Sequence, residues 1–149
     1  MTAEVTRQSL GRLRRAAIDS HVNECHTLFN RIVVSDQQVS CAPGIRSSVE
    51  ELASTDADFS EMVSHISESE TYRRFIKLIE FRLTRSYQAG QRGGYHSANE
   101  FRTDLALLKS SLAANRGGRV VERFVQPWID LANTFGFHFA RLDIRPVSY

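Results

Sequence analysis

The sequence predicts a mainly α-helical fold that ends in one β-strand. Apolar residues recur at three- and four-residue steps over most of the 149 residues, as in helices that bury one face. From Phe137 the apolar residues alternate instead, which is the period of a strand. Capping boxes and glycines separate the helical stretches, without an internal repeat or a low-complexity tract. Residues 1–149 are therefore expected to form a single segment.

The first expected helix covers about 3–32, and its buried face is a regular series of apolar or small residues. That series comprises Leu10, Leu13, Ala17, His21, Cys25, Leu28 and Ile32. Arginines decorate its polar side.

Residues 35–46 contain a Pro-Gly pair and are expected to form a loop. A capping box that begins at Ser47 opens a short helix at about 47–54. A second short helix, at about 58–67, starts at Asp58.

Three longer helices follow, at about 70–89, 97–115 and 119–135. Their expected buried residues are Tyr72, Phe75, Ile76, Ile79, Leu83, Tyr87, Phe101, Leu105, Leu108, Leu112, Val121, Phe124, Val125, Trp128, Ile129 and Ala132. Pro127 lies inside the last helix and predicts a kink or a restart, because proline lacks the backbone donor and clashes with the preceding turn.

The strand at about 137–145 has one apolar and one charged face. The apolar face carries Ala140, Leu142 and Ile144, together with His138. The opposite face carries Arg141, Asp143 and Arg145. If this strand is one piece of a helix-decorated α/β barrel, the charged face points inward, near the carboxyl end where barrel enzymes place their active sites. Asp143 would hold both arginines, and Arg145 would be the better placed to meet an anionic substrate.

Composition narrows the classes of protein. The formal net charge of +2 is too small to indicate a nucleic-acid or membrane partner. There are 17 arginines against two lysines, which codon usage explains better than anion recognition without a defined site. The start is polar, no apolar run is long enough to cross a bilayer, and two unpaired cysteines suit a reducing compartment. We therefore expect a cytoplasmic protein.

Two other patterns have simpler structural explanations. His21 and Cys25 have the spacing of metal ligands on a helix, but a second ligand pair is missing and both fall on the apolar face, so packing is favoured. The glycine-rich stretch 90–95 lacks both the preceding strand and the Gly-Lys-Ser/Thr ending of a phosphate loop, which favours a helix-terminating loop.

The end of the chain carries a recognisable pattern. Residues 135–145 follow F-G-F-H-x-A-x-L-D-I-R, with Ser148 beyond. Upstream, residues 95–105 follow Y-H-S-A-x-E-F-x-x-D-L, and residues 111–118 follow S-L-x-A-N-x-G-G. This combination resembles phosphoenolpyruvate carboxylases from about Tyr72 onward, and more loosely from Leu10.

The resemblance implies a cytoplasmic enzyme that adds bicarbonate to phosphoenolpyruvate and releases oxaloacetate and phosphate, a carbon-fixing reaction that replenishes the tricarboxylic acid cycle. Such enzymes need Mg²⁺ or Mn²⁺, are usually homotetramers, and are built on a helix-decorated barrel. Their active-site arginine in the L-D-I-R-Q motif corresponds to Arg145, which would contact anionic substrate as a catalytic residue. Arg141 and Asp143 would support it.

Two departures limit what the chain is expected to do. Pro146 and Val147 stand where the family has Gln and a variable residue. The T-A-H-P-T, G-R-G-G and G-Y-S-D-S-x-K motifs of the family are absent, and the sequence shows no carboxylate pair for a metal. The chain therefore resembles an internal or truncated piece of the enzyme and is expected to be inactive alone.

One alternative belongs to another class of protein. A non-catalytic helical interaction module would hide its terminal strand by pairing it with another chain, so that the chain self-associates. Nucleic-acid binding is a weaker alternative, because the arginines are scattered rather than striped.

Overall fold

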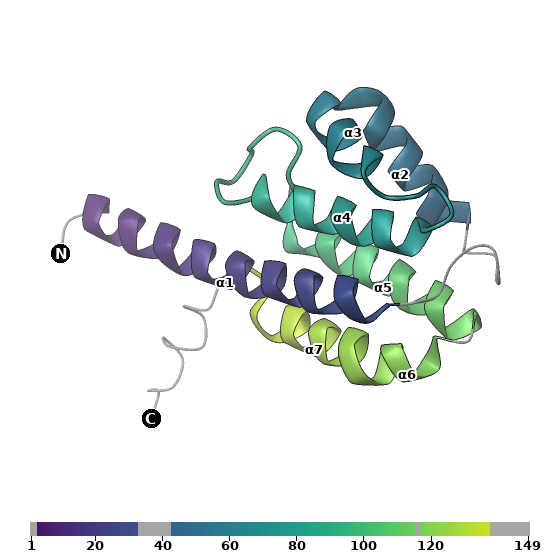
Figure 1. Ribbon diagram of the computed structural model, residues 1–149. Helices are drawn as coiled ribbons and strands as arrows, with labels where there is room; N and C mark the ends of the chain where they lie inside the picture. Colours follow the sequence, from purple (N-terminus) through teal and green to yellow (C-terminus); the bar gives the residue numbers. More distant parts are fainter. Residues whose placement is uncertain (1–2, 33–42, 116, 138–149) are drawn as a thin grey trace.

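The computed structural model describes residues 3–32, 43–115 and 117–137, and every regular element within these ranges is helical (Figure 1). The elements are α1 (Ala3–Arg31), α2 (Pro43–Thr55), α3 (Ala57–Ser64), α4 (Thr71–Thr84), α5 (Ala98–Ala114), α6 (Gly118–Val120), the π-helical turn η1 (Val121–Val125) and α7 (Gln126–Phe135). The mainly α-helical prediction is confirmed. The strand expected at 137–145 lies outside the described residues except for Phe137, which is in a turn. The strand and its barrel stay predictions.

Helix α4 is the centre of the bundle, because α1, α2, α3 and α5 all pack against it. Eight of its 14 residues are buried, on more than one face, as expected of a core helix rather than a surface helix. The buried apolar side chains of the helices join in one continuous cluster. Among the described residues, we find no helix with the length and apolar character needed to span a membrane.

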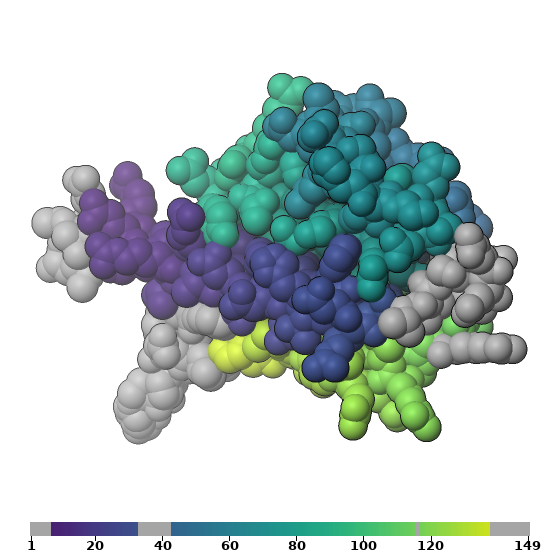
Figure 2. All heavy atoms as spheres, viewed as in Figure 1, coloured from purple at the N-terminus to yellow at the C-terminus, as the bar shows by residue number. Residues whose placement is uncertain are grey.

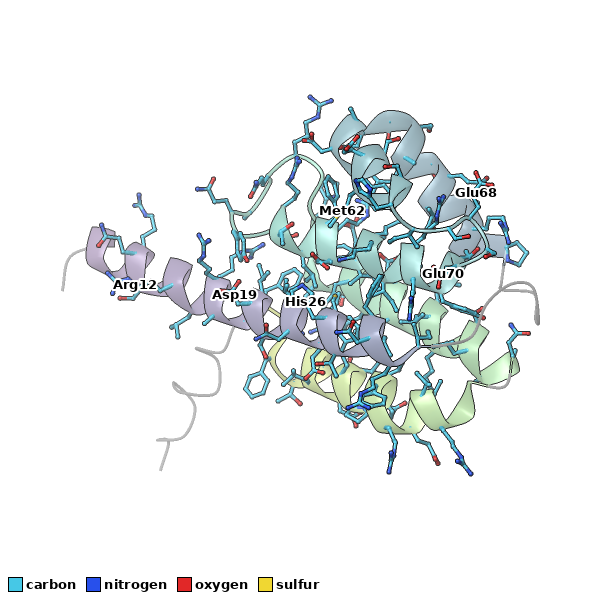
Figure 3. The ribbon with its side chains drawn as sticks, in the orientation of Figure 1. Arg12, Asp19, His26, Met62, Glu68 and Glu70 are labelled. Atoms are coloured by element: carbon cyan, nitrogen blue, oxygen red, sulfur yellow. The ribbon has the colours of Figure 1, made fainter. Side chains whose placement is uncertain are left out.

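Helix α1 packs on the bundle through its second half, and its first turns project beyond it (Figures 1 and 2). The expected face is buried from Ala17 to Ile32. Leu10, which was expected on the same face, is 48% exposed because no described element reaches it. Figure 3 labels Arg12 on the projecting part and Asp19 further along the helix, and both side chains are exposed.

Helices α2 and α3 begin differently from the expected boundaries. Helix α2 starts at Pro43, where a missing backbone N–H costs nothing in the first turn. Ser47 is therefore inside the helix, and its hydroxyl donates to the Pro43 carbonyl oxygen at 2.9 Å. Helix α3 is capped by Asp56, whose Oδ1 accepts from the backbone N–H groups of Asp58 and Phe59 at 2.9 and 3.1 Å.

Helix α4 ends at Thr84, five residues before the expected end at 89. The hydroxyl of Ser86 donates to the carbonyl four residues earlier at 2.6 Å and accepts from the backbone N–H of Tyr95 at 2.7 Å. Gly94 lies so close that an added Cβ would be 2.2 Å from the Arg85 carbonyl oxygen. The chain therefore folds back at Ser86, before the glycines that were expected to end the helix.

The C-terminal helices match the expected pattern more closely. Helix α5 buries Phe101, Leu105, Leu108 and Leu112 as expected. The helix expected at 119–135 is interrupted by η1, which ends two residues before Pro127. The wider π-helical turn gives room to the proline ring, which would clash with the preceding turn of a regular α-helix. The predicted irregularity at this proline is confirmed.

Candidate functional site

The residues predicted to carry the chemistry, Arg141, Asp143 and Arg145, lie outside the described residues. The structure describes the turn at Gly136 and Phe137 from which that segment starts. Helices α1, α5 and α7 meet around this turn. We call the side chains that hold it the exit seat, which comprises Arg14, His21, Phe101, Arg102 and Trp128.

Phe137 is the apolar anchor of the turn, with 2% of its surface exposed. Its ring stacks on Phe101, with 5.6 Å between the centroids and 24° between the planes, and Tyr95 lies 6.4 Å away. The Arg14 guanidinium lies over the same ring at 5.3 Å, while Arg14 Nε donates to the Ser86 carbonyl oxygen at 2.8 Å. Phe137 is thus fixed by α1, α5 and the loop after α4 together.

Gly136 ends α7 in a conformation that side chains rarely adopt, with φ at +54° and ψ at −117°. Its N–H donates to the Ala132 carbonyl oxygen at 2.8 Å. Arg102 donates to the same oxygen from Nε at 3.2 Å and from Nη2 at 3.0 Å. A cation is favourable at this end of a helix, where the last carbonyl groups lack helical partners. Arg102 therefore ties α5 to the end of α7.

His21 connects α1 to the same turn through both ring nitrogens. Its Nε2 lies 2.7 Å from the Gly136 carbonyl oxygen, which can only accept, so Nε2 carries the hydrogen. Its Nδ1 accepts from the indole N–H of Trp128 at 3.1 Å and must therefore be unprotonated. The ring is fully buried and neutral in one defined tautomer.

The electrostatics of His21 favour the neutral ring. Burial lowers the pKa of His21, the hydrogen bond to the Gly136 carbonyl opposes that shift, and the nearby Arg102 charge lowers the pKa further. The packing role predicted for His21 and Cys25 is confirmed, since both are fully buried. Burial also raises the pKa of the Cys25 thiol, which makes it a poor nucleophile. The bond from His21 to a residue 115 positions away could not be inferred from spacing.

Polar residues of the upstream motifs form hydrogen bonds between helices. The Tyr95 hydroxyl donates to Asp104 Oδ2 at 2.7 Å. Tyr72 and Ser111 share a buried hydrogen bond of 2.7 Å between their hydroxyl oxygens, and Asn115 Nδ2 donates to the Tyr72 hydroxyl at 3.2 Å. These bonds connect α5 to the loop after α4 and to α4 itself.

Burial raises the pKa of Asp104, while the Tyr95 hydrogen bond and the Arg82 charge oppose the shift. Burial and the same carboxylate raise the pKa of Tyr95. The hydroxyl therefore stays a donor. Arg82, Tyr95 and Asp104 also line a polar pocket of about 410 Å³ beside the exit seat, together with His96, Glu100 and Thr103.

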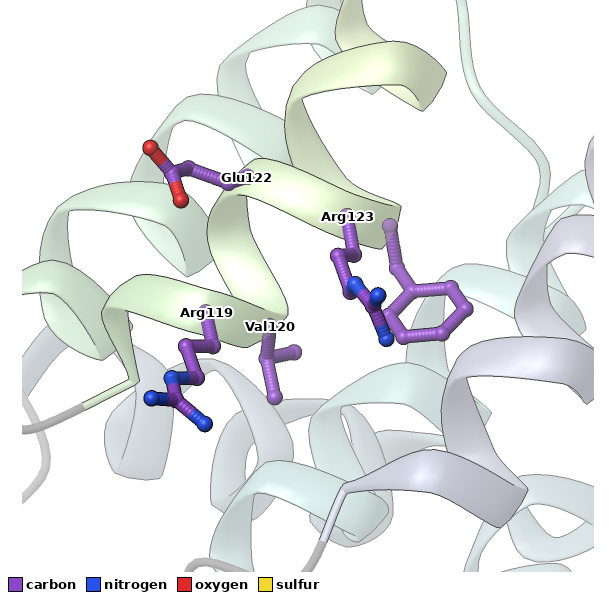
Figure 4. A pocket seen from close by; sticks show the side chains of 5 residues that line it. Arg119, Val120, Glu122 and Arg123 are labelled. Atoms are coloured by element: carbon purple, nitrogen blue, oxygen red, sulfur yellow. The ribbon is translucent and has the colours of Figure 1, made fainter.

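A second pocket, of about 440 Å³, lies at the far end of the last helices (Figure 4). Arg119 and Arg123 line it with Val120, Glu122 and Phe124. It is roughly 18 Å from the Gly136 turn, counting 1.5 Å of rise for each residue along the helix. It is therefore separate from the exit seat.

No cluster in 3–32, 43–115 and 117–137 brings together three His, Cys, Asp or Glu side chains in a way that could hold a metal ion. We therefore assign none of the described residues to the Mg²⁺ or Mn²⁺ that the resemblance implies.

The fold and the exit seat define an α-helical segment that holds the chain firmly where it leaves α7. The family model for phosphoenolpyruvate carboxylase matches residues 1–149, and the chain belongs to that family.

Three curated relatives show the extent of the similarity. A phosphoenolpyruvate carboxylase of Roseiflexus castenholzii is 28% identical over 161 positions, covering 99% of this chain and 17% of that protein. One from Xanthomonas campestris pv. campestris is 29% identical, covering 91% and 15%. One from Bradyrhizobium diazoefficiens is 26% identical, covering 99% and 16%. The chain spans less than a fifth of the length of these relatives.

Proposed function

We propose that this chain supplies one substrate-contacting strand and its supporting helices to a phosphoenolpyruvate carboxylase, which forms oxaloacetate and phosphate from phosphoenolpyruvate and bicarbonate. The observation that carries the proposal is the family match over residues 1–149. The exit seat supports it, because a strand whose side chain contacts substrate must begin at a fixed position in the fold. The proposal places this reaction in the cytoplasm, within the homotetramer usual for the family.

Arg145 is the catalytic residue in this proposal. Its guanidinium offers a planar fork of donors that matches phosphate or carboxylate oxygens. Placed at the carboxyl end of the strand, it would hold the anionic substrate and stabilise the negative charge that develops as phosphate is transferred. Asp143 and Arg141, on the same face of the predicted strand, would support it by ion pairing.

The chain alone is not expected to perform the reaction. One arginine provides neither a base nor a second anion site, and none of the described side chains is assigned to the divalent metal. A direct test is bicarbonate-dependent oxaloacetate production by the isolated 149 residues, followed through NADH oxidation in a coupled malate dehydrogenase assay. We expect no activity above background, and robust turnover would contradict the proposal that the chain is incomplete.

The role of Arg145 is tested in a chimera that carries this chain in place of the matching segment of the Roseiflexus castenholzii relative. Arg145→Gln is expected to lower kcat/KM about 100- to 1,000-fold, the usual effect of removing a donor to developing negative charge. Arg92→Gln, at an exposed loop position, is the matched control and should change kcat/KM less than twofold. Retained activity in Arg145→Gln would remove Arg145 from the catalytic machinery.

A non-catalytic interaction module is the second candidate, and the projecting start of α1 with its exposed Leu10 favours it. Light scattering distinguishes the surfaces involved. If the terminal strand pairs with another chain, a chain that stops at Phe137 should be monomeric while the full chain is dimeric. If Leu10 mediates association, Leu10→Gln should give the monomer instead.

A further inference from the structure

We propose that a polar groove beside the first half of α1 is a docking surface for an acidic segment of a partner protein. The groove has a volume of about 590 Å³ and lies between α1 and the start of the loop after α4 (Figure 1). Its lining residues, which we call the arginine groove, are Gln8, Gly11, Arg12, Arg15, Tyr87, Gln88 and Gln91. The inference goes beyond the proposed carboxylase role and does not depend on it.

Arg12 and Arg15 give the arginine groove its positive charge. They are three residues apart on α1, so they share one face of the helix, and both are exposed. None of the ion pairs or hydrogen bonds among the described side chains engages either guanidinium. Two like charges on one helix face repel each other, and a carboxylate placed between them would offset that repulsion. The charges of the groove therefore favour an anionic occupant.

Arg15 is held in place by Tyr87, which belongs to the loop after α4. The Arg15 guanidinium lies 4.2 Å from the centroid of the Tyr87 ring, and the Tyr87 hydroxyl donates to Asp19 Oδ1. A guanidinium stacked on an aromatic ring keeps the N–H groups at its edge free to donate. Asp19 is engaged by Tyr87 and does not line the groove. Arg15 therefore presents a fixed fork of donors and loses little rotamer freedom when it binds a carboxylate.

The other lining side chains indicate a peptide segment rather than a small molecule. Small-molecule sites are mostly apolar with a few polar groups, whereas five of the seven residues that line this groove are arginine or glutamine. Glutamine amides both donate and accept, which suits the N–H and C=O groups of a peptide backbone. From Gln8 to Arg15 the helix rises about 10 Å, the length of about three extended residues. A short stretch with two or three carboxylates thus matches the groove in charge and in length.

Fluorescence anisotropy of a labelled hexaglutamate peptide tests the proposal on the 149-residue chain. We expect saturable binding that weakens as salt is added, because salt screens exposed charges. A hexaglutamine peptide, which has the same backbone without the charges, should not bind. The double variant Arg12→Gln, Arg15→Gln should weaken binding by about tenfold or more. Arg15→Lys keeps the charge but loses the planar stack, and should weaken it about threefold.

The double variant Arg119→Gln, Arg123→Gln is the matched control, because it removes two exposed arginines at the far end of the last helices. It lowers the net charge by the same amount and should change the affinity less than about twofold. Circular dichroism checks that both double variants fold. Equal weakening in the two would overturn the proposal, since the peptide would then respond to net charge and not to the groove. Absence of binding to the unmodified chain would overturn it as well.

Three other occupants of the groove give distinct results, and each of these results would overturn the proposal. Displacement of the peptide by inorganic phosphate at matched ionic strength would indicate a site for small anions. A dimer of the unmodified chain that becomes a monomer in Arg12→Gln, Arg15→Gln, as measured by light scattering, would indicate a second copy of the chain. Binding that disappears in the folded Roseiflexus castenholzii chimera would indicate that the rest of the enzyme fills the groove.

Discussion

The His21 ring makes two hydrogen bonds, one as donor and one as acceptor. Together they fix the neutral form and the tautomer of a side chain whose ordinary pKa lies near neutrality. A protonated ring would carry hydrogens on both nitrogens, and Nδ1–H would face the N–H of Trp128 instead of accepting from it. Charging His21 therefore breaks one bond and places an ion in a buried site near Arg102. The sequence predicted that His21 is buried, from its place on the apolar face of α1. It could not predict the bonded partners, which come from the other end of the chain.

The stability of the chain should therefore fall on acidification. The folded state lowers the pKa of His21 below its ordinary value of 6.5, so below that pH the unfolded chain binds a proton that the folded chain does not. The stabilisation is fully present above 6.5 and is lost as the pH falls toward the folded-state pKa. The slope contributed by one such group is at most about 1.4 kcal/mol for each pH unit.

Urea unfolding between pH 5 and 7 measures this slope. His21→Gln cannot titrate and should therefore be less dependent on pH in the same range. Equal slopes in the unmodified chain and in His21→Gln would show that His21 is not the group responsible.

Gly136 should be intolerant of any side chain. An added Cβ would lie 3.0 Å from Arg102 Nη2 and 3.3 Å from the Ala98 Cβ, at a φ of +54° that side chains avoid. We expect Gly136→Ala to lower the free energy of unfolding by about 1–3 kcal/mol, combining backbone strain with overpacking.

Gly11→Ala is the matched control for this substitution. Gly11 lies within α1 with open space around its Cβ position, and alanine should stabilise the helix by up to about 1 kcal/mol. The two substitutions add the same methyl group, and the changes in the free energy of unfolding that urea denaturation measures should have opposite signs. A neutral Gly136→Ala would contradict the geometry of the turn.

At the scale of the elements, periodicity predicted the helices better than local patterns predicted their ends. The repeat of apolar residues locates α1, α4, α5 and α7. The serine box at Ser47 did not open α2, because Pro43 supplies an equally good first turn four residues earlier. The end of α4 depends on Ser86 bonding to Tyr95 across the loop, and such a contact is not visible in the residues around position 84.

The hydrogen bond between α5 and the loop after α4 should depend on an acceptor oxygen at residue 104 and not on the charge of that residue. Asp104→Asn keeps an oxygen for the Tyr95 hydroxyl and removes a partly buried charge, so stability at pH 7 should change by less than about 1 kcal/mol. Asp104→Ala leaves a buried hydroxyl without its acceptor and should cost about 1–3 kcal/mol. Urea unfolding of both variants decides this, and equal losses would show that the charge matters more than the bond.

At the scale of the whole molecule, the described helices form one cluster with two distinct edges. One edge is the projecting start of α1, where Leu10 is exposed, and the other is the exit seat. The sequence predicted the mainly α-helical class of fold, whereas the residues of the final segment that it predicts to carry chemistry lie outside the described residues. It could not predict the exit seat, because its contacts join α1, α5 and α7 across about 115 residues, and a pattern within one element contains no such information.

The single cluster predicts that the chain unfolds as one unit even though it spans less than a fifth of its relatives. Trp128 is the only tryptophan in the sequence, and its fluorescence reports the exit seat through its contact with His21. Circular dichroism at 222 nm reports all the helices together. If the seat and the bundle share one core, the two urea transitions should coincide, as two-state unfolding requires.

The projecting turns of α1 should not disturb this agreement, because they contribute few buried contacts and fray without exposing the core. The double variant Trp128→Phe, Phe59→Trp moves the probe to the α3 side of the cluster, and its fluorescence and circular dichroism midpoints should coincide with each other. A fluorescence transition for Trp128 at lower urea than the circular dichroism transition would show that the exit seat opens separately. In that case the rest of the bundle would not be enough to hold the Gly136 turn in place.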